Sequence, residues 1–185
     1  RYTVRAVNGD VMSAYKSTDT LKYNVTPTVK VANASNGVKV SWSTVANATG
    51  YTVYSSTYNA KTKKWSGWTN RGTTKATTTS WVDKKATKSG TYYKYTVRAC
   101  NGKAFKSSYN KNGAKTLYLA EPTVKIANNA SGIKVSWNKI SGAKGYTIYR
   151  QEIVNGEWTG WKNLGTIKNG STVSWVDKSV KSGTT

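Results

Sequence analysis

Two pairs of tryptophans are the residues of this chain whose type and spacing could bind a ligand. In each pair the indoles lie three positions apart with a glycine between them. Neighbouring indole rings can form a flat surface for a sugar ring, and one tyrosine near each pair is expected to point outward. The candidate ligand-binding residues are therefore Trp65, Trp68, Trp158, Trp161, Tyr54 and Tyr149.

The same pattern has a structural interpretation, which we prefer at this stage. One indole of each pair would cover the edge of a hydrophobic core in a short strand, because a small module fills its core with a few large side chains. The chain has eight Trp and thirteen Tyr but one Phe, so tryptophans and tyrosines must supply the aromatic part of the core. We expect Trp42, Trp81, Trp137 and Trp175 to serve packing.

The charge is the second feature with chemical consequences. The chain has 29 Lys and Arg against 7 Asp and Glu, a formal net charge of +22. Such a charge attracts polyanions, including a glycan or an anionic cell-wall polymer. The candidate polyanion contacts, Lys39, Lys94, Arg98 and Lys134, are expected on both faces of a module. No specific nucleic-acid binding is expected, because that function favours a concentrated patch. A solvated, self-repelling surface is the alternative that we prefer.

The sequence argues against catalysis. It contains no His, so it has no imidazole base, no His-dependent triad and no His-bound metal. Asp83 and Asp177 recur at equivalent positions, each followed by Lys, and are expected to cap turns. The single Cys100 excludes an internal disulfide and is expected to be a small filler residue. We expect no enzyme activity, no cofactor and no metal site, and the sequence has no apolar run that would span a bilayer.

The elements that hold these residues form a repeated module of about 93 residues. The first nine residues, RYTVRAVNG, match KYTVRACNG at 94–102, and the KSGTT of 181–185 matches KSGTY at 88–92. Within 88–102, Tyr93, Tyr95, Val97 and Ala99 alternate with polar residues, which predicts a strand with one buried and one wet face. Asn-Gly at 101–102 then predicts a hairpin turn.

Six further segments have strand patterns, and no helix is expected. They are 28–32, 38–42, 51–54, 65–68, 80–83 and 114–118, and most have counterparts near 133–137, 146–149, 158–161 and 174–177. Seven short strands with frequent turns in about 93 residues are typical of a β-sandwich. The fold class is therefore all-β, with tandem seven-stranded antiparallel sandwiches.

The order of these residues resembles the fibronectin type III module. Pro27, the VxVxW strand ending at Trp42, Tyr51-x-Val53, Asp83, and the strand from Tyr93 to Ala99 stand where that family has its landmarks. The resemblance implies that Tyr93 is a corner tyrosine whose hydroxyl bonds the preceding turn. The Asn, Thr and Lys-rich style is similar to tandem repeats of secreted Gram-positive surface proteins. That likeness implies an extracellular, structural or adhesive repeat.

The repeat divides the chain into three parts. Residues 1–25 would be the last two strands of one module, 26–119 a complete module, and 120–185 the first strands of another. Two interpretations remain open. The third part accepts residues 1–23 of another copy, so that subunits polymerise by strand complementation, or the chain is a window on a continuous array or a proteolytic fragment.

Overall fold

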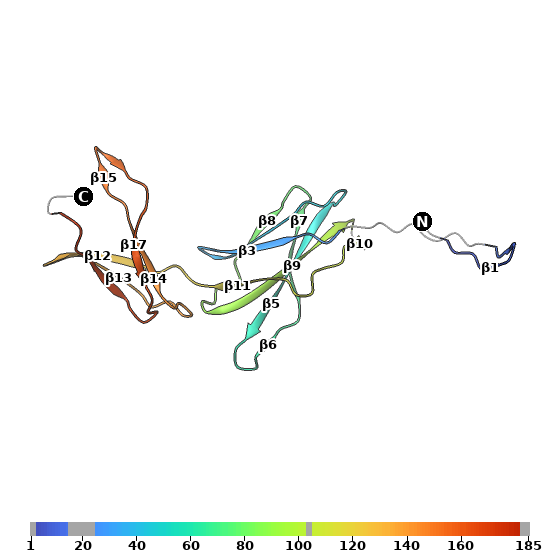
Figure 1. Cartoon of the computed structure of the whole chain (residues 1–185), viewed down its shortest axis with the longest axis horizontal. Coiled ribbons are helices and arrows are strands. Elements are labelled where there is room, and N and C mark those ends of the chain that lie inside the picture. Colours follow the sequence, from blue (N-terminus) through green and yellow to red (C-terminus); the bar gives the residue numbers. More distant parts are fainter. Residues whose placement is uncertain (1–2, 15–24, 103–104, 182–185) are drawn as a thin grey trace.

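The computed structural model describes residues 3–14, 25–102 and 105–181, which form eighteen strands and no helix. The expected all-β class with antiparallel pairing is therefore confirmed. The strands from 29 to 118 form one sandwich (hereafter the central sandwich), those from 124 to 177 form the C-terminal unit, and the N-terminal hairpin lies apart from both (Figure 1). A search of these residues finds no helix suited to crossing a membrane.

The central sandwich has two sheets. One has the order β3-β4-β8 and the other β7-β5-β9-β11, with two short strands extending β5 and β9. Two antiparallel sheets packed face to face are the sandwich architecture that fibronectin type III modules share. The bounds are β3 (Val29–Ala34), β4 (Gly37–Trp42), β5 (Gly50–Asn59), β6 (Lys64–Trp65), β7 (Thr69–Lys75), β8 (Ser80–Asp83), β9 (Thr91–Asn101), β10 (Phe105–Lys106) and β11 (Ala114–Tyr118).

The core lies between the two sheets and follows the period-2 pattern. The alternate residues Tyr93, Tyr95, Val97 and Ala99 of β9 are buried, and they pack in one cluster with the inward residues of β4 and β5. Trp42 is 6% exposed and its counterpart Trp137 is 7% exposed, so both tryptophans serve packing. The Tyr93 hydroxyl bonds the backbone of Lys88, which is the corner contact that the resemblance implies.

One expected strand is displaced. Only Lys64–Trp65 of the region around 65–68 is in a strand, and the long strand that pairs with β5 is β7, directly after it. The irregular stretch 66–68, which contains the glycine between the tryptophans, connects β6 to β7. The tryptophan pair therefore lies at a corner of the sheet.

The C-terminal unit repeats the first half of the central sandwich. Its pairings are β12-β13-β18, β14-β17 and β15-β16. Within the described residues β14 pairs only with β17, whereas its counterpart β5 pairs with both β7 and β9. The bounds are β12 (Val124–Asn129), β13 (Gly132–Trp137), β14 (Tyr146–Arg150), β15 (Ile153–Val154), β16 (Glu157–Trp158), β17 (Lys162–Ile167) and β18 (Ser174–Asp177).

The N-terminal hairpin consists of β1 (Val7–Asn8) and β2 (Val11–Met12). Its pairs Val7↔Met12 and Asn8↔Val11 correspond to Cys100↔Lys106 and Asn101↔Phe105 in β9–β10, where the partners are one residue further apart in the sequence. The strand expected over Ser13 to Tyr23 lies mostly outside the described residues, as does the KSGTT match beyond residue 181.

A small contact joins the central sandwich to the C-terminal unit. The Ser89 hydroxyl donates to the Ser141 carbonyl at 2.8 Å and accepts from the Ala120 amide at 3.1 Å. Gly90 and Gly142 approach each other there, and a Cβ on either would press on the other's backbone. The two units therefore meet through residues that have little or no side chain.

Candidate ligand-binding site

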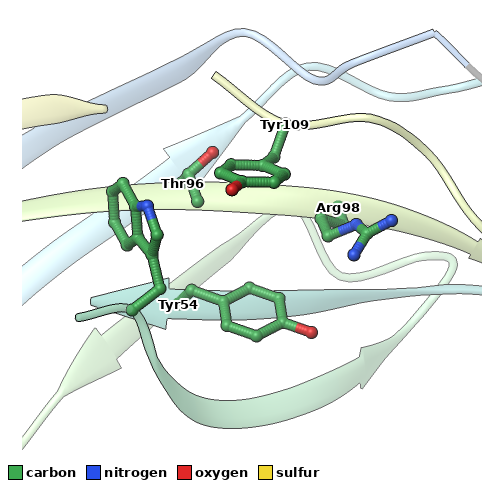
Figure 2. A pocket seen from close by; sticks show the side chains of 5 residues that line it. Tyr54, Thr96, Arg98 and Tyr109 are labelled. Atoms are coloured by element: carbon green, nitrogen blue, oxygen red, sulfur yellow. The ribbon is translucent and has the colours of Figure 1, made fainter. Parts of the chain in front are cut away.

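The outer face of the β5–β9 sheet carries a small hollow. Tyr54 from β5, Thr96 and Arg98 from β9, Tyr109 and Trp68 enclose a cavity of about 180 Å³. Figure 2 shows the four labelled side chains around this hollow, with Thr96 and Arg98 projecting from the same strand. The rings of Trp68 and Tyr109 meet edge to face, with centroids 6.2 Å apart and an interplanar angle of 82°. The hollow is a corner and not a parallel slot.

Cations stand over the aromatic rings of this face. The Lys94 ammonium is 4.8 Å from the centroid of Trp68 and 5.0 Å from that of Trp65. Lys106 reaches the Tyr54 hydroxyl at 3.2 Å, and the Arg98 guanidinium lies 5.8 Å from the Tyr109 ring. Such cation–π contacts are favourable by about 0.5–1 kcal/mol at exposed sites. The Trp65–Trp68 pair is therefore covered by a lysine and is not the open flat surface that its spacing suggested.

Thr96 is the one buried polar side chain in this hollow that lacks a partner among the described residues. It is 1% exposed, and its hydroxyl makes no hydrogen bond. A buried hydroxyl without a hydrogen bond is destabilising by about 1–3 kcal/mol. A group of this kind in a cavity wall is an unused donor and acceptor.

The other predicted site residues lie apart from the hollow. Trp158 is 65% exposed, Trp161 is 68% exposed and Tyr149 is also exposed, and no described side chain stacks on these three rings. Lys39 and Lys134 are exposed on β4 and β13, in sheets that do not contain β9. The structure thus brings together Tyr54, Trp65, Trp68, Lys94 and Arg98, and separates the rest.

Sequence reasoning missed Thr96, Lys106 and Tyr109. Thr96 lies between Lys94 and Arg98 on the outward phase of β9, so the alternation could have placed it in this row. Its burial was not foreseen, because that face was expected to be wet. Tyr109 comes from an irregular segment after the hairpin, and such a segment has no periodicity that predicts where a side chain points.

A buried carboxylate lies on the opposite side of this sheet. Asp83 accepts from the Lys85 amide at 3.1 Å, which is the expected turn cap. It also accepts from Arg71 Nε at 2.9 Å and Nη2 at 2.6 Å, and from the Tyr95 hydroxyl at 3.1 Å. The hydrogen bond to Asp83 raises the pKa of Arg71, while burial first and the nearby carboxylate second raise the pKa of Tyr95. These contacts hold Arg71 charged and Tyr95 neutral.

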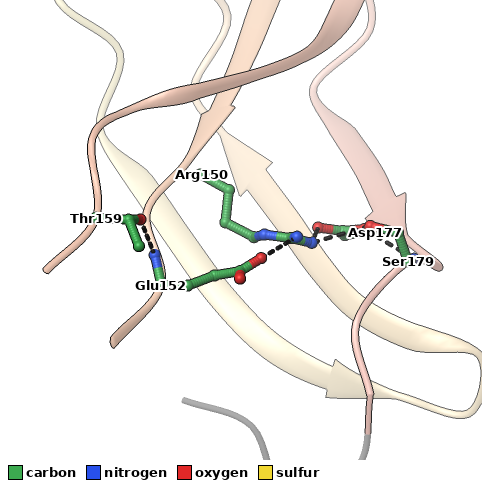
Figure 3. Close-up of polar contacts among 5 residues, drawn as sticks. All are labelled: Arg150, Glu152, Thr159, Asp177 and Ser179. Carbon is green, nitrogen blue, oxygen red and sulfur yellow. Dashed lines mark hydrogen bonds and ion pairs between the residues drawn. The ribbon is translucent and has the colours of Figure 1, made fainter. Parts of the chain in front are cut away.

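The C-terminal unit has an equivalent carboxylate, shown in Figure 3. Arg150 donates to Asp177 at 2.6 Å and also pairs with Glu152, while the Ser179 amide and hydroxyl donate to Asp177 at 2.9 and 2.7 Å. Burial alone would raise the pKa of Asp177. The hydrogen bonds from Ser179 and Arg150 outweigh burial and lower that pKa. Both carboxylates are thus fully engaged in structural contacts.

No group of three or more metal-binding side chains (His, Cys, Asp or Glu) occurs within the described ranges. Cys100 is a buried thiol 3.2 Å from the Thr52 hydroxyl. The hollow beside Thr96 combines aromatic walls, a buried hydroxyl without a partner among the described residues, and nearby cations.

Comparisons with known proteins give no family assignment. No family model matches the chain, and no curated protein matches it. Among solved structures, the chain is similar to the FN1–FN3 domains of chicken CNTN1, at 18% identity and a TM-score of 0.40. That alignment covers 98% of this chain and 66% of the other, so this chain spans a little under two thirds of its length.

Proposed function

We propose that this chain is a non-catalytic structural repeat of an extracellular protein, which spaces, presents or assembles other parts. The architecture of the chain supports this proposal. Two sandwich-type units follow one another with a short connection, and their buried carboxylates are occupied by arginine and turn contacts. The bacterial surface origin that the sequence style implies belongs to this proposal as well.

Assembly of copies is the specific part of the proposal, and one observation carries it. The N-terminal hairpin reproduces the β9–β10 hairpin contact by contact. The Ser13 amide donates to the Ala6 carbonyl at 2.9 Å, as Ser107 does to Ala99 at 2.7 Å. The Ser13 hydroxyl accepts from the Ala6 amide at 3.0 Å, and Ser107 accepts from Ala99 at the same distance.

The two hairpins differ in what covers them. Val97 of β9 is fully buried between the sheets, whereas Val4, its counterpart, is 89% exposed. The strand β14 has one edge without a partner among the described residues. We propose that residues 3–14 of a second copy add to this edge, as β9 adds to β5, because strand addition supplies backbone hydrogen bonds and buries the apolar face together.

The β5–β9 register predicts the new pairing. Tyr51 faces Ala99 and Val53 faces Val97, so Ala6 is expected opposite Tyr146 and Val4 opposite Ile148. Cysteines at positions 4 and 148, in a Cys100→Val background, would then be close enough for a disulfide. Oxidation is expected to give a ladder of covalent oligomers on a non-reducing gel.

Three outcomes of this experiment separate the possibilities. Pairing Val4→Cys with Thr147→Cys is the control, because residue 147 faces the other side of β14 and no ladder is expected. A fast-migrating monomer would place the hairpin on its own chain and would exclude exchange between copies. A free thiol at both positions after oxidation would refute the pairing altogether.

A second test measures association that no disulfide has trapped. Val4→Lys puts a charge on the face that is proposed to be buried, so the sedimentation-averaged mass should fall to that of the 20.2 kDa chain. Val154→Lys changes an equally apolar residue of the β15–β16 hairpin, which is also exposed, and should leave association unchanged. Association that is equal in both variants would contradict the proposal.

A second candidate function is binding of a glycan or an anionic cell-wall polymer. It is favoured by the lysine between Trp65 and Trp68 and by the hollow beside that pair. Binding to a polysaccharide that persists at high salt and is lost in Trp65→Ala/Trp68→Ala would support it. Binding that salt abolishes would indicate the diffuse charge alone.

A further inference from the structure

We propose that the hollow formed by Tyr54, Trp68, Thr96, Arg98 and Tyr109 binds one acidic sugar ring, a pyranose that carries a carboxylate. This inference rests on the second candidate function above and names its site and ligand class. It is independent of whether copies associate, because every lining residue belongs to the central sandwich of a single chain.

The shape of the hollow selects a puckered ring. Its volume of about 180 Å³ is below the 300–1,000 Å³ typical of drug-sized ligands, which suits a single six-membered ring. The Trp68 and Tyr109 rings stand nearly perpendicular, so they contact two adjacent sides of a guest. A pyranose presents C–H groups on both sides, whereas a flat nucleobase needs a parallel stacking surface. The corner therefore favours the sugar.

Thr96 lines the hollow, and we propose that its hydroxyl supplies the polar contact there. It is almost fully buried and has no hydrogen-bond partner among the described residues. Ligand pockets characteristically combine apolar walls with a few polar groups that fix orientation. A sugar hydroxyl or ring oxygen that enters the hollow would satisfy Thr96, so binding removes an existing penalty in the free protein.

The rim supplies the charge. Arg98, Lys94 and Lys106 stand around the aromatic rings, and none of the five residues lining the hollow is acidic. The Arg98 Nε already donates to the Ser107 carbonyl at 2.6 Å, which orients its guanidinium beside the opening. A ring carboxylate at the rim would therefore meet a held cation, and such charge-assisted hydrogen bonds are stronger than neutral ones.

The same residue types recur in separate places elsewhere. Tyr149 and Trp161 lie on the C-terminal unit, and Thr3 and Arg5 lie in the N-terminal segment. Strand addition between copies would bring these four together in the arrangement of Tyr54, Trp68, Thr96 and Arg98. The Val4→Lys chain should consequently retain the single site of the central sandwich, which separates failure of this inference from failure of assembly.

The test is a calorimetric titration of the whole Val4→Lys chain with trigalacturonic acid in 0.5 M NaCl, where exposed charges are largely screened. We expect saturable binding at one site per chain. The trisaccharide's neutral methyl ester should bind at least tenfold more weakly. A single-stranded thymidine octanucleotide is the competing probe, and equal or tighter binding of it would overturn the assignment to a sugar.

The decisive variants form a matched pair. Thr96→Val replaces the unpaired hydroxyl by a methyl group, so it should weaken binding about tenfold while raising the melting temperature. Thr74→Val removes another buried, unpaired hydroxyl, one that does not line the hollow, so it should raise stability and leave the affinity unchanged. Equal affinity of the two variants would refute the role of Thr96.

The aromatic wall has its own control. Trp68→Ala should reduce affinity at least tenfold, whereas Trp158→Ala removes an exposed indole far along the chain and should not. Chemical-shift changes of the Thr96 and Arg98 amides on titration would locate the ligand. Shifts spread over Lys39 and Lys134 instead would indicate diffuse charge and would contradict the site.

Discussion

Arg71 and Asp83 form a two-pronged ion pair inside the central sandwich, with the carboxylate only 1% exposed. The C-terminal unit makes the same kind of pair with its arginine on a different strand. On β14, Arg150 stands at the position that Ser55 has on β5. On β17, Leu164 stands at the position that Arg71 has on β7. In each unit an arginine therefore pairs with the buried carboxylate of that unit, but the arginine comes from a different strand.

The different position of the arginine in the two units predicts that a second substitution can restore lost stability. Arg71→Leu leaves Asp83 buried without a cation and should reduce the stability of the central sandwich by about 3 kcal/mol. Adding Ser55→Arg should recover part of this loss, because the equivalent arginine of the other unit reaches its aspartate. Amide hydrogen exchange of β9 reports on this sandwich alone. Unchanged protection in Arg71→Leu would show that the pair is dispensable.

Tyr95 predicts sensitivity to alkali. Its pKa is raised above the ordinary value of 10.0, so the folded state keeps the phenol proton at a pH where the unfolded state loses it. This contribution to stability is complete below pH 10 and decreases as the pH rises above it. Phenolate absorbance should therefore show a fraction of tyrosine that ionises only on unfolding. In Tyr95→Phe that fraction should shrink.

Asp177 predicts sensitivity to acid in the C-terminal unit. Its pKa lies below the ordinary value of 3.8, so its contribution to stability is present above pH 3.8 and is lost as the pH falls through the lower folded value. Asp177→Asn should unfold more easily at neutral pH and depend less on acid. Asp10→Asn, which changes an exposed carboxylate, is the control and should leave the acid transition in place.

Gly37 predicts a backbone-specific loss of stability. Its φ is +145°, and a Cβ there would overlap the backbone oxygen of Asp83. Gly37→Ala should therefore lower the unfolding free energy by about 2 kcal/mol and shift the thermal midpoint down. Gly67→Ala meets no neighbouring atom and should leave the midpoint unchanged. Similar midpoints for the two variants would contradict the proposed overlap.

The alternation of residues predicted the core well, because inward positions depend only on the period of a strand. Tyr93, Tyr95, Val97 and Ala99 are buried as expected, and so are Trp42 and Trp137. The ion pairs could not be predicted in this way. Arg71 meets Asp83 only because β7 and β8 lie in facing sheets, and the sequence alone does not say how those sheets are aligned.

The candidate site was predictable in part. The sequence grouped Tyr54 and Trp68 as ligand-binding candidates and Lys94 and Arg98 as separate polyanion contacts, and the structure places these four on one face. Trp158 and Trp161, which the sequence also selected, lie in the open. The difference is that β9 and the segment around Tyr109 cover the first pair. Local patterns specify which way a side chain points, whereas its cover comes from strands distant in the sequence.

The near contact of Gly90 with Gly142 has a geometric consequence for any longer series of such units. Two positions without side chains allow the loops of consecutive units to touch, so the angle at each joint depends on backbone shape. A methyl group at either position would push the two loops apart. The pitch of the whole string would then change although every sandwich in it stayed intact.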